Sequence, residues 1–232
     1  MYNNSEVANA FAKIPIFYNL PKEILDKLET ISKTALYRKK DLIAIQGDQI
    51  SNLIIVKTGM INLVFTNYLY EEIFFTSLTK NDPIGVFEIL YEQNYSYSAK
   101  ALTDCEVYEI PCSNFLQYAS QNLQLKKNIN DEIAALLNRS YDIIRESNTR
   151  IEQKILNTIL FLAEEFGTFK SNIVEIKLIP SQVEIALMAG TTRETICRTF
   201  SSLQKEDRII VDKSSIVIPD FEKFKKLTEN FN

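Results

Sequence analysis

The sequence has 232 residues, of which 46% are hydrophobic, and this length suits two domains with cores of their own. Its formal net charge is −4, so a nucleic-acid partner would be met by a local basic patch rather than by bulk charge. The chain contains no histidine, which removes Ser-His and Cys-His nucleophile pairs and imidazole ligands for metal or haem. We therefore expect neither an enzyme nor a metal site.

The three cysteines, Cys105, Cys112 and Cys197, form no C-x-x-C motif and are interpreted as reduced structural thiols. The first residues lack a basic segment followed by an apolar stretch, and no run approaches ~18 apolar residues. These patterns predict a soluble protein without a membrane partner, in a bacterial cytoplasm or a plastid stroma.

Residues 14–31 predict a short amphipathic helix that follows a proline. Its apolar positions are Leu20, Ile24, Leu25, Leu28 and Ile31. From residue 35 to 110 the pattern changes to short apolar or alternating runs, such as NLIIVKTG and CEVYEIP, separated by Gly, Asn and Asp. Several short strands at this spacing predict a β sandwich or a jelly-roll barrel.

A helical pattern returns at Asn114. From residue 123 to 151, apolar residues and two serines recur along one side of the predicted helix, and we call this row the seam. The seam positions are Ile129, Ile133, Leu136, Leu137, Ser140, Ile143, Ile144, Ser147 and Ile151. Steps of three and four are typical of a helix that pairs with another helix, so we expect a dimer. The alternative is a long helix packed on its own barrel. The polar residues ESNT, 146–149, mark the domain boundary, and the helix that follows ends at Gly167.

The segment SQVEIALMAGTTRETICRTFSSL reads as two helices around a tight turn. Ser181 is a good N-cap for the first helix, with Ala186 small where the second helix crosses it. The expected buried face of the first helix is Val183, Ile185 and Met188. Gly190 allows the turn, and Thr191 or Thr192 caps the second helix.

The second helix has an apolar inner face that turns its charged residues outward. That inner face is Ile196, Phe200 and Leu203. Arg193, Glu194 and Arg198 then suit base reading, because arginine matches guanine O6 and N7 and a carboxylate accepts from cytosine N4. The alternative is a solvated pairing of Glu194 with Arg198.

After this helix, DRIIVDKSSIVIPD predicts two short strands joined by a polar turn, the wing of a winged helix-turn-helix. The expected strands are 209–211 and 216–218. Lys205, Arg208 and Lys213 are natural phosphate contacts. From residue 150 onward, basic and acidic residues are equal in number, so this prediction depends on arrangement rather than on charge.

Over nearly its full length the chain resembles the Crp/Fnr superfamily of transcription regulators. TTRETICR matches the family's recognition helix at Arg193, Glu194 and Arg198, which in the cyclic-AMP receptor branch contact the bases of a TGTGA-like half-site. The resemblance implies the same roles here, with Ser181 and Thr192 holding the DNA backbone. It also implies a homodimer that binds a pseudo-palindromic double-stranded site and has RNA polymerase as a partner.

The expected fold class is α+β in three parts. Residues 1–122 form an effector-type β jelly-roll barrel with a leading helix, similar to a cyclic-nucleotide-binding domain. Residues 123–148 form a dimerisation helix and hinge, and residues 149–232 form a winged helix-turn-helix domain. Asn81 stands where the family usually has a turn glycine, and Asn tolerates the left-handed region best among the alternatives.

The resemblance places the effector pocket at Gly85, Val86, Phe87, Tyr97, Ser98 and Ala135. Cyclic-nucleotide binders carry a Glu after the glycine of their phosphate-binding cassette and an Arg-Ser pair near the end of that cassette. This chain has Val86 at the first position and Tyr97 and Ser98 at the second. Cyclic AMP is therefore not expected, and no cofactor is identified. The segment IGVFEIL is similar to the cassette of the cyanobacterial nitrogen regulator NtcA, which binds 2-oxoglutarate. A regulator of that kind, or one without an effector that acts mainly through a protein partner, is the alternative.

Overall fold

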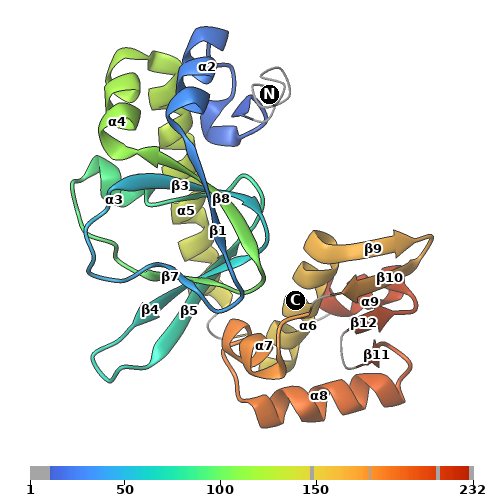
Figure 1. The fold of residues 1–232 in the computed structure, drawn as a ribbon. Helices are drawn as coiled ribbons and strands as arrows, with labels where there is room; N and C mark the ends of the chain where they lie inside the picture. Colours follow the sequence, from blue (N-terminus) through green and yellow to red (C-terminus); the bar gives the residue numbers. More distant parts are fainter. Residues whose placement is uncertain (1–10, 147–148, 178, 213–214, 230–232) are drawn as a thin grey trace. The chain divides into compact units, whose positions relative to one another are not determined.

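The computed structural model describes residues 11–146, 149–177, 179–212 and 215–229. The chain divides into two compact units, Met1–Asp142 and Ile143–Asn232, and each is described by itself (Figure 1). Within the described residues, no helix is both long enough and apolar enough to span a membrane.

The first unit is built on two four-stranded sheets in which all neighbouring strands are antiparallel. One sheet has the order β1 (Lys33–Tyr37), β8 (Cys105–Pro111), β3 (Asn52–Thr58), β6 (Pro83–Ile84). The other has the order β2 (Leu42–Ala44), β7 (Ser98–Ala101), β4 (Ile61–Thr66), β5 (Glu72–Leu78). Val56 and Val107 of the first sheet and Leu63 and Ala99 of the second share one buried core. The jelly-roll prediction is confirmed, as two packed sheets rather than one closed barrel.

A second core of this unit joins the sheets to the helices that precede and follow them. These are the 3-10 turn η1 (Pro15–Phe17), α2 (Lys22–Ile31) and α4 (Cys112–Gln121), of which α2 and α4 lie at one end of the sheets (Figure 1). The helix predicted from residue 14 begins only at Lys22. Pro21 is its N-cap, and a proline disfavours helical backbone at the residue before it.

Helix α5 (Leu123–Glu146) has one buried half and one exposed half. Leu125 and Ile129 lie in the second core. Further along, the seam residues Leu137, Ile143 and Ile144 are 51%, 40% and 66% exposed, and Tyr141, which the predicted seam does not include, is 55% exposed. Packing on the helix's own domain therefore accounts for the first part of the predicted seam and leaves the second part open to solvent.

In its described residues, the second unit has a four-stranded antiparallel sheet and four helices. Its elements are α6 (Ile151–Phe166), β9 (Gly167–Lys170), β10 (Ile173–Lys177), α7 (Gln182–Met188), α8 (Arg193–Lys205), β11 (Ile210–Val211), β12 (Ser215–Ile218) and α9 (Phe221–Glu229). The sheet order is β11-β12-β10-β9. The sequence predicts the two wing strands to within a residue but does not predict β9 and β10. Gly167 ends α6 as expected, and a Cβ there would lie 2.2 Å from the Ala163 carbonyl oxygen, so the close approach requires glycine.

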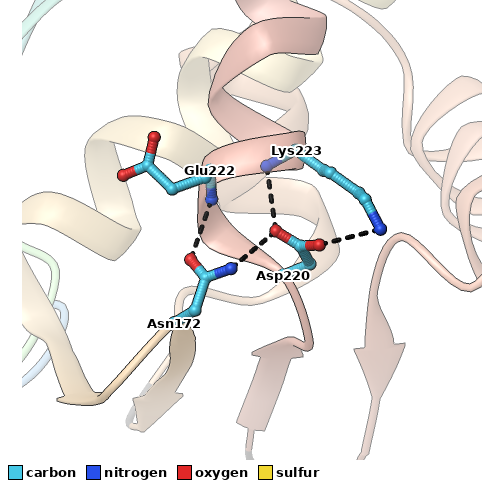
Figure 2. Close-up of polar contacts among 4 residues, drawn as sticks. All are labelled: Asn172, Asp220, Glu222 and Lys223. Carbon is cyan, nitrogen blue, oxygen red and sulfur yellow. Dashed lines mark hydrogen bonds and ion pairs between the residues drawn. The ribbon is translucent and has the colours of Figure 1, made fainter.

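A polar cluster fastens α9 to the turn between β9 and β10 (Figure 2). Asn172 donates from Nδ2 to Asp220 Oδ1 at 2.7 Å and accepts from the Glu222 backbone amide at 3.1 Å. Asp220 also accepts from the Lys223 backbone amide at 3.0 Å and pairs with Lys223 Nζ at 3.0 Å. These contacts satisfy helical N–H groups that have no partner within the first turn.

Candidate nucleic-acid interface

Helix α7 begins with a capping box. The Ser181 hydroxyl accepts from the Glu184 backbone amide at 3.3 Å, and the Glu184 carboxylate accepts from the Ser181 amide at 2.6 Å. The predicted N-cap is confirmed, and Ser181 is exposed at the surface of the unit. Two otherwise unpaired N–H groups are thus satisfied at the start of the motif.

The buried face of α7 consists of Ile185 and Ala186, with Ala189 buried directly after the helix. The prediction that Val183 belongs to this face is wrong, since Val183 is 61% exposed. Two residues correspond to about 200° around an α-helix, so residues 183 and 185 lie on nearly opposite sides. Met188 is half-buried.

The turn between the helices depends on a left-handed residue. Gly190 has a φ of +62°, which favours glycine, although nothing within 4 Å would obstruct a Cβ there. The Thr191 amide donates to the Ala186 carbonyl at 2.9 Å and closes the turn. Of the two candidate caps, Thr192 is the one that caps α8, because its hydroxyl accepts from the Thr195 amide at 3.3 Å.

Helix α8 separates an apolar inner face from a charged outer one, as the sequence predicts. Ile196, Phe200 and Leu203 are buried. The three predicted base-reading residues, Arg193, Glu194 and Arg198, are all exposed within the first two turns of the helix. Cys197 lies at the flank, half-buried, with its thiol donating to Gln182 Oε1 at 3.0 Å.

The pKa of the exposed Glu194 carboxyl lies below its usual value. Its own backbone amide and the Thr192 hydroxyl lower the pKa of Glu194, and the positive charges of Arg193 and Arg198 add to this effect. An ionised carboxylate only accepts hydrogen bonds. Among the ion pairs of the described residues, none joins Glu194 to Arg198, whose Nη2 donates instead to Thr195 Oγ1 at 3.3 Å. The solvated pairing considered from the sequence is therefore not present.

The predicted phosphate contacts are distributed over the end of α8 and the wing. Lys205 is exposed and lines a shallow hollow along the helix with Cys197, Arg198, Ser201 and Ser202. Arg208 is half-buried, and its Nε lies 3.9 Å from Glu206 Oε2. Lys213 lies outside the described residues.

Sequence reasoning missed three polar residues of this surface, Thr195, Ser201 and Ser202. Their spacing from Arg198 was the available signal, because positions three or four residues apart share one side of a helix. Ser201 and Ser202 follow Arg198 at these distances, and Thr195 precedes it by three.

The predicted effector residues largely come together in the first unit. Gly85, Val86, Phe87, Tyr97 and Ala135 line one pocket, in which Val86 and Phe87 belong to α3 (Val86–Leu90). Ser98 is not part of the lining, and its hydroxyl accepts from the Gln46 amide at 3.1 Å. Ser98 is the first residue of β7 (Ser98–Ala101), and Tyr97 lies in the bend before the strand. The Asn81 prediction is confirmed by a φ of +75°.

This pocket is small and partly closed by the protein itself. Its volume is about 40 Å³, whereas small-molecule sites typically measure ~300–1,000 Å³. Tyr97 is buried, and its hydroxyl accepts from the Gly85 amide at 3.0 Å. Burial and the nearby charge of Glu88 raise the pKa of Tyr97, so the phenol stays neutral.

Carboxyl groups outnumber cations around the pocket. Glu88 is buried and Glu132 half-buried, whereas the one arginine of the lining, Arg139, lies 3.5 Å from Asp82. Burial, followed by the charge of Asp82, raises the pKa of Glu132. A dianionic ligand would meet net repulsion in this setting.

Both units match known protein families. Residues 35–122 match the cyclic nucleotide-binding domain, and residues 153–227 match the Crp-like helix-turn-helix domain. Electron transport regulator A of Shewanella oneidensis is 27% identical over 220 residues, which cover 92% of this chain and 86% of that protein. The cAMP-activated global transcriptional regulator CRP of Salmonella typhimurium is 24% identical over 185 residues, covering 78% of this chain and 87% of that protein.

Solved structures show the same fold. A CRP/FNR family transcriptional regulator from Thermus thermophilus has a TM-score of 0.71 at 20% identity, with 86% of this chain and 100% of that chain covered. A cyclic-nucleotide-type β domain, a long helix and a winged helix-turn-helix together define a DNA-binding transcription regulator. This chain belongs to the Crp/Fnr family of such regulators.

Proposed function

We propose that this regulator is a homodimer that recognises a pseudo-palindromic, TGTGA-like DNA site through Arg193, Glu194 and Arg198. The observation that carries the proposal is the outer face of α8, where these three side chains are exposed together in the first two turns. The N-terminal turns of a recognition helix are the part that reaches base edges in the major groove. Two arginines and one ionised carboxylate supply the donors for guanine and the acceptor for cytosine.

The DNA backbone is held, in this proposal, by groups at the edges of the motif. Ser181 and Thr192 are exposed N-caps, and N–H groups at a helix start favour a phosphate. Lys205, Arg208 and Lys213 supply positive charge at the end of α8 and at the wing. Such contacts set register and orientation and carry no sequence information of their own.

Dimerisation is supported by the exposed half of α5. Leu137, Tyr141 and Ile144 step by four and three, and together they form an apolar stripe on the solvent side of the helix. Pairing this stripe with a second copy would remove it from water. A palindromic site requires two recognition helices about one DNA turn apart, ~34 Å, and two copies of the chain supply one helix each.

We further propose that the regulator does not respond to cyclic AMP and has RNA polymerase as its protein partner. The absence of a response to cyclic AMP is supported by the cavity of about 40 Å³ and by the hydrogen bond that holds the Tyr97 hydroxyl at the Gly85 amide. The excess of carboxyl groups weighs against 2-oxoglutarate, the alternative effector. A ligand that binds the folded state raises the melting temperature of the protein. We expect no shift with cyclic AMP or with 2-oxoglutarate, and a saturable shift with either would reject this part.

Selection of DNA sites by the full-length protein from a random pool tests the main proposal. We expect an enriched site with two inverted half-sites whose centres are ~10–10.5 base pairs apart, each resembling TGTGA. Enrichment of a single asymmetric half-site would reject the homodimeric mode, and the absence of any enriched sequence would reject sequence-specific recognition.

A further inference from the structure

Two threonine hydroxyls lie beside the Arg198 guanidinium on the surface of α8. Arg198 Nη2 donates to Thr195 Oγ1 at 3.3 Å. Thr195 Oγ1 lies 3.1 Å from Thr192 Oγ1. Thr192 Oγ1 also accepts from the Thr195 backbone amide at 3.3 Å. Thr195 is thus held by the helix cap on one side and contacts Arg198 on the other.

The direction of the contact with Arg198 follows from its chemistry. A guanidinium only donates, so Arg198 Nη2 is the donor and Thr195 Oγ1 is the acceptor. A hydroxyl has two acceptor positions and one proton, so Thr195 Oγ1 can accept from Arg198 and still form its hydrogen bond with Thr192 Oγ1.

We infer that Thr195 is a positioning residue that orients the Arg198 guanidinium for base recognition before DNA is bound. This inference rests on the proposed function. An exposed arginine otherwise samples many rotamers, and ordering it on binding reduces affinity. The bond to Thr195 uses one of five N–H donors of the guanidinium, so a bidentate pair remains for guanine. Thr192 is required as well, since it is both the helix cap and the acceptor for Thr195.

The alternative role for Thr195 is a direct phosphate contact, and the two roles differ in what they change. A phosphate contact contributes equally to all sequences, whereas orientation of Arg198 contributes only at the base pair that Arg198 reads. Thr195→Val removes the hydroxyl and keeps the β-branched shape, with little change in helix propensity. Thr195→Ser restores the hydroxyl, and Thr195→Ala serves if the valine variant does not fold.

The experiment measures affinities of the full-length protein for the selected site and for variants with each base pair substituted in turn. Arg198→Ala first identifies the base pair that Arg198 reads. We expect Thr195→Val to reduce discrimination at that base pair about three- to tenfold and to leave non-specific affinity and melting temperature unchanged. Thr195→Ser should retain discrimination.

Equal weakening at all sequences, or no change in discrimination, would overturn the inference. If Arg198→Ala itself left discrimination intact at every base pair, the proposed function would fail instead, so the two failures are distinguishable.

Discussion

The hydroxyl of Tyr97 accepts a hydrogen bond from the backbone amide of Gly85, at 3.0 Å and away from solvent. Gly85 has a φ of +88° and precedes α3, so the bond satisfies an amide at the turn where the pocket begins. The aromatic ring of Tyr97 therefore occupies space in the pocket, and its hydroxyl provides the hydrogen-bond acceptor for the Gly85 backbone amide. The protein's own side chain thus satisfies this part of the pocket wall.

Replacing Tyr97 with phenylalanine tests that role. We expect Tyr97→Phe to lower the free energy of unfolding of the β domain by about 1–3 kcal/mol, because the buried Gly85 amide loses its acceptor. Urea denaturation followed by circular dichroism provides the measurement. Tyr68→Phe is the matched control, since Tyr68 is 90% exposed and its loss of a hydroxyl should have little effect. Equal stability of both variants would show that the bond contributes nothing.

A carboxylate in the apolar stripe of α5 should separate the subunits. Leu137→Asp places a charge in the proposed interface, and burying it unpaired is costly, so we expect the dimer dissociation constant to rise by about 100-fold or more. Analytical ultracentrifugation measures this change. Asn138→Asp introduces the same residue one position along the helix, outside the stripe, and should leave the dimer intact. A Leu137→Asp protein as dimeric as the parent would remove the stripe from the interface.

Protonation of Asp220 should make the second unit less stable in acid. The backbone amide and side chain of Lys223 lower the pKa of Asp220 in the folded state. A lowered pKa stabilises the fold above the unfolded pKa, about 3.9, and this contribution is lost as the pH falls through the folded value. Asp220→Asn should therefore show a weaker loss of stability between about pH 5 and pH 2.

The measurement for Asp220 is thermal unfolding across that pH range. Glu222→Gln is the neighbouring control, because the Glu222 carboxylate points away from the cluster in Figure 2 and only its backbone amide takes part. The account of this cluster would be wrong if the two variants had the same pH dependence.

The helix-turn-helix is well predicted from the sequence because local rules determine it. Gly190 acts through its own backbone and Thr192 through a hydroxyl that caps the adjacent turn, and the spacing of Ile196, Phe200 and Leu203 follows from helical geometry alone. Val183 is the exception, because its apolar character suggests burial while the angle between residues 183 and 185 places it on the other side of the helix.

Two side-chain hydrogen bonds, one in the pocket and one on α8, could not be predicted from the sequence, for a different reason. The contact of Tyr97 with Gly85 joins residues twelve positions apart across a fold, and no spacing rule predicts which phenol meets which amide. The bond from Arg198 to Thr195 is local, but it depends on rotamers that propensity does not determine. The same limit applies to β9 and β10, which pair with each other while β10 pairs with β12, because their short runs give little signal before this pairing is known.

The most direct test of base reading by α8 compares specific with non-specific binding in the arginine variants. For Arg193→Ala and Arg198→Ala, we expect the preference of the full-length protein for its selected site over scrambled DNA to fall by about 5- to 150-fold for each arginine–guanine pair lost. Weak, salt-sensitive binding should persist. Arg38→Ala, an exposed arginine of the β domain, is the matched control and should bind as the parent does. If both recognition-helix variants bound the selected site as tightly as the parent, with the same preference over scrambled DNA, the central claim would be contradicted.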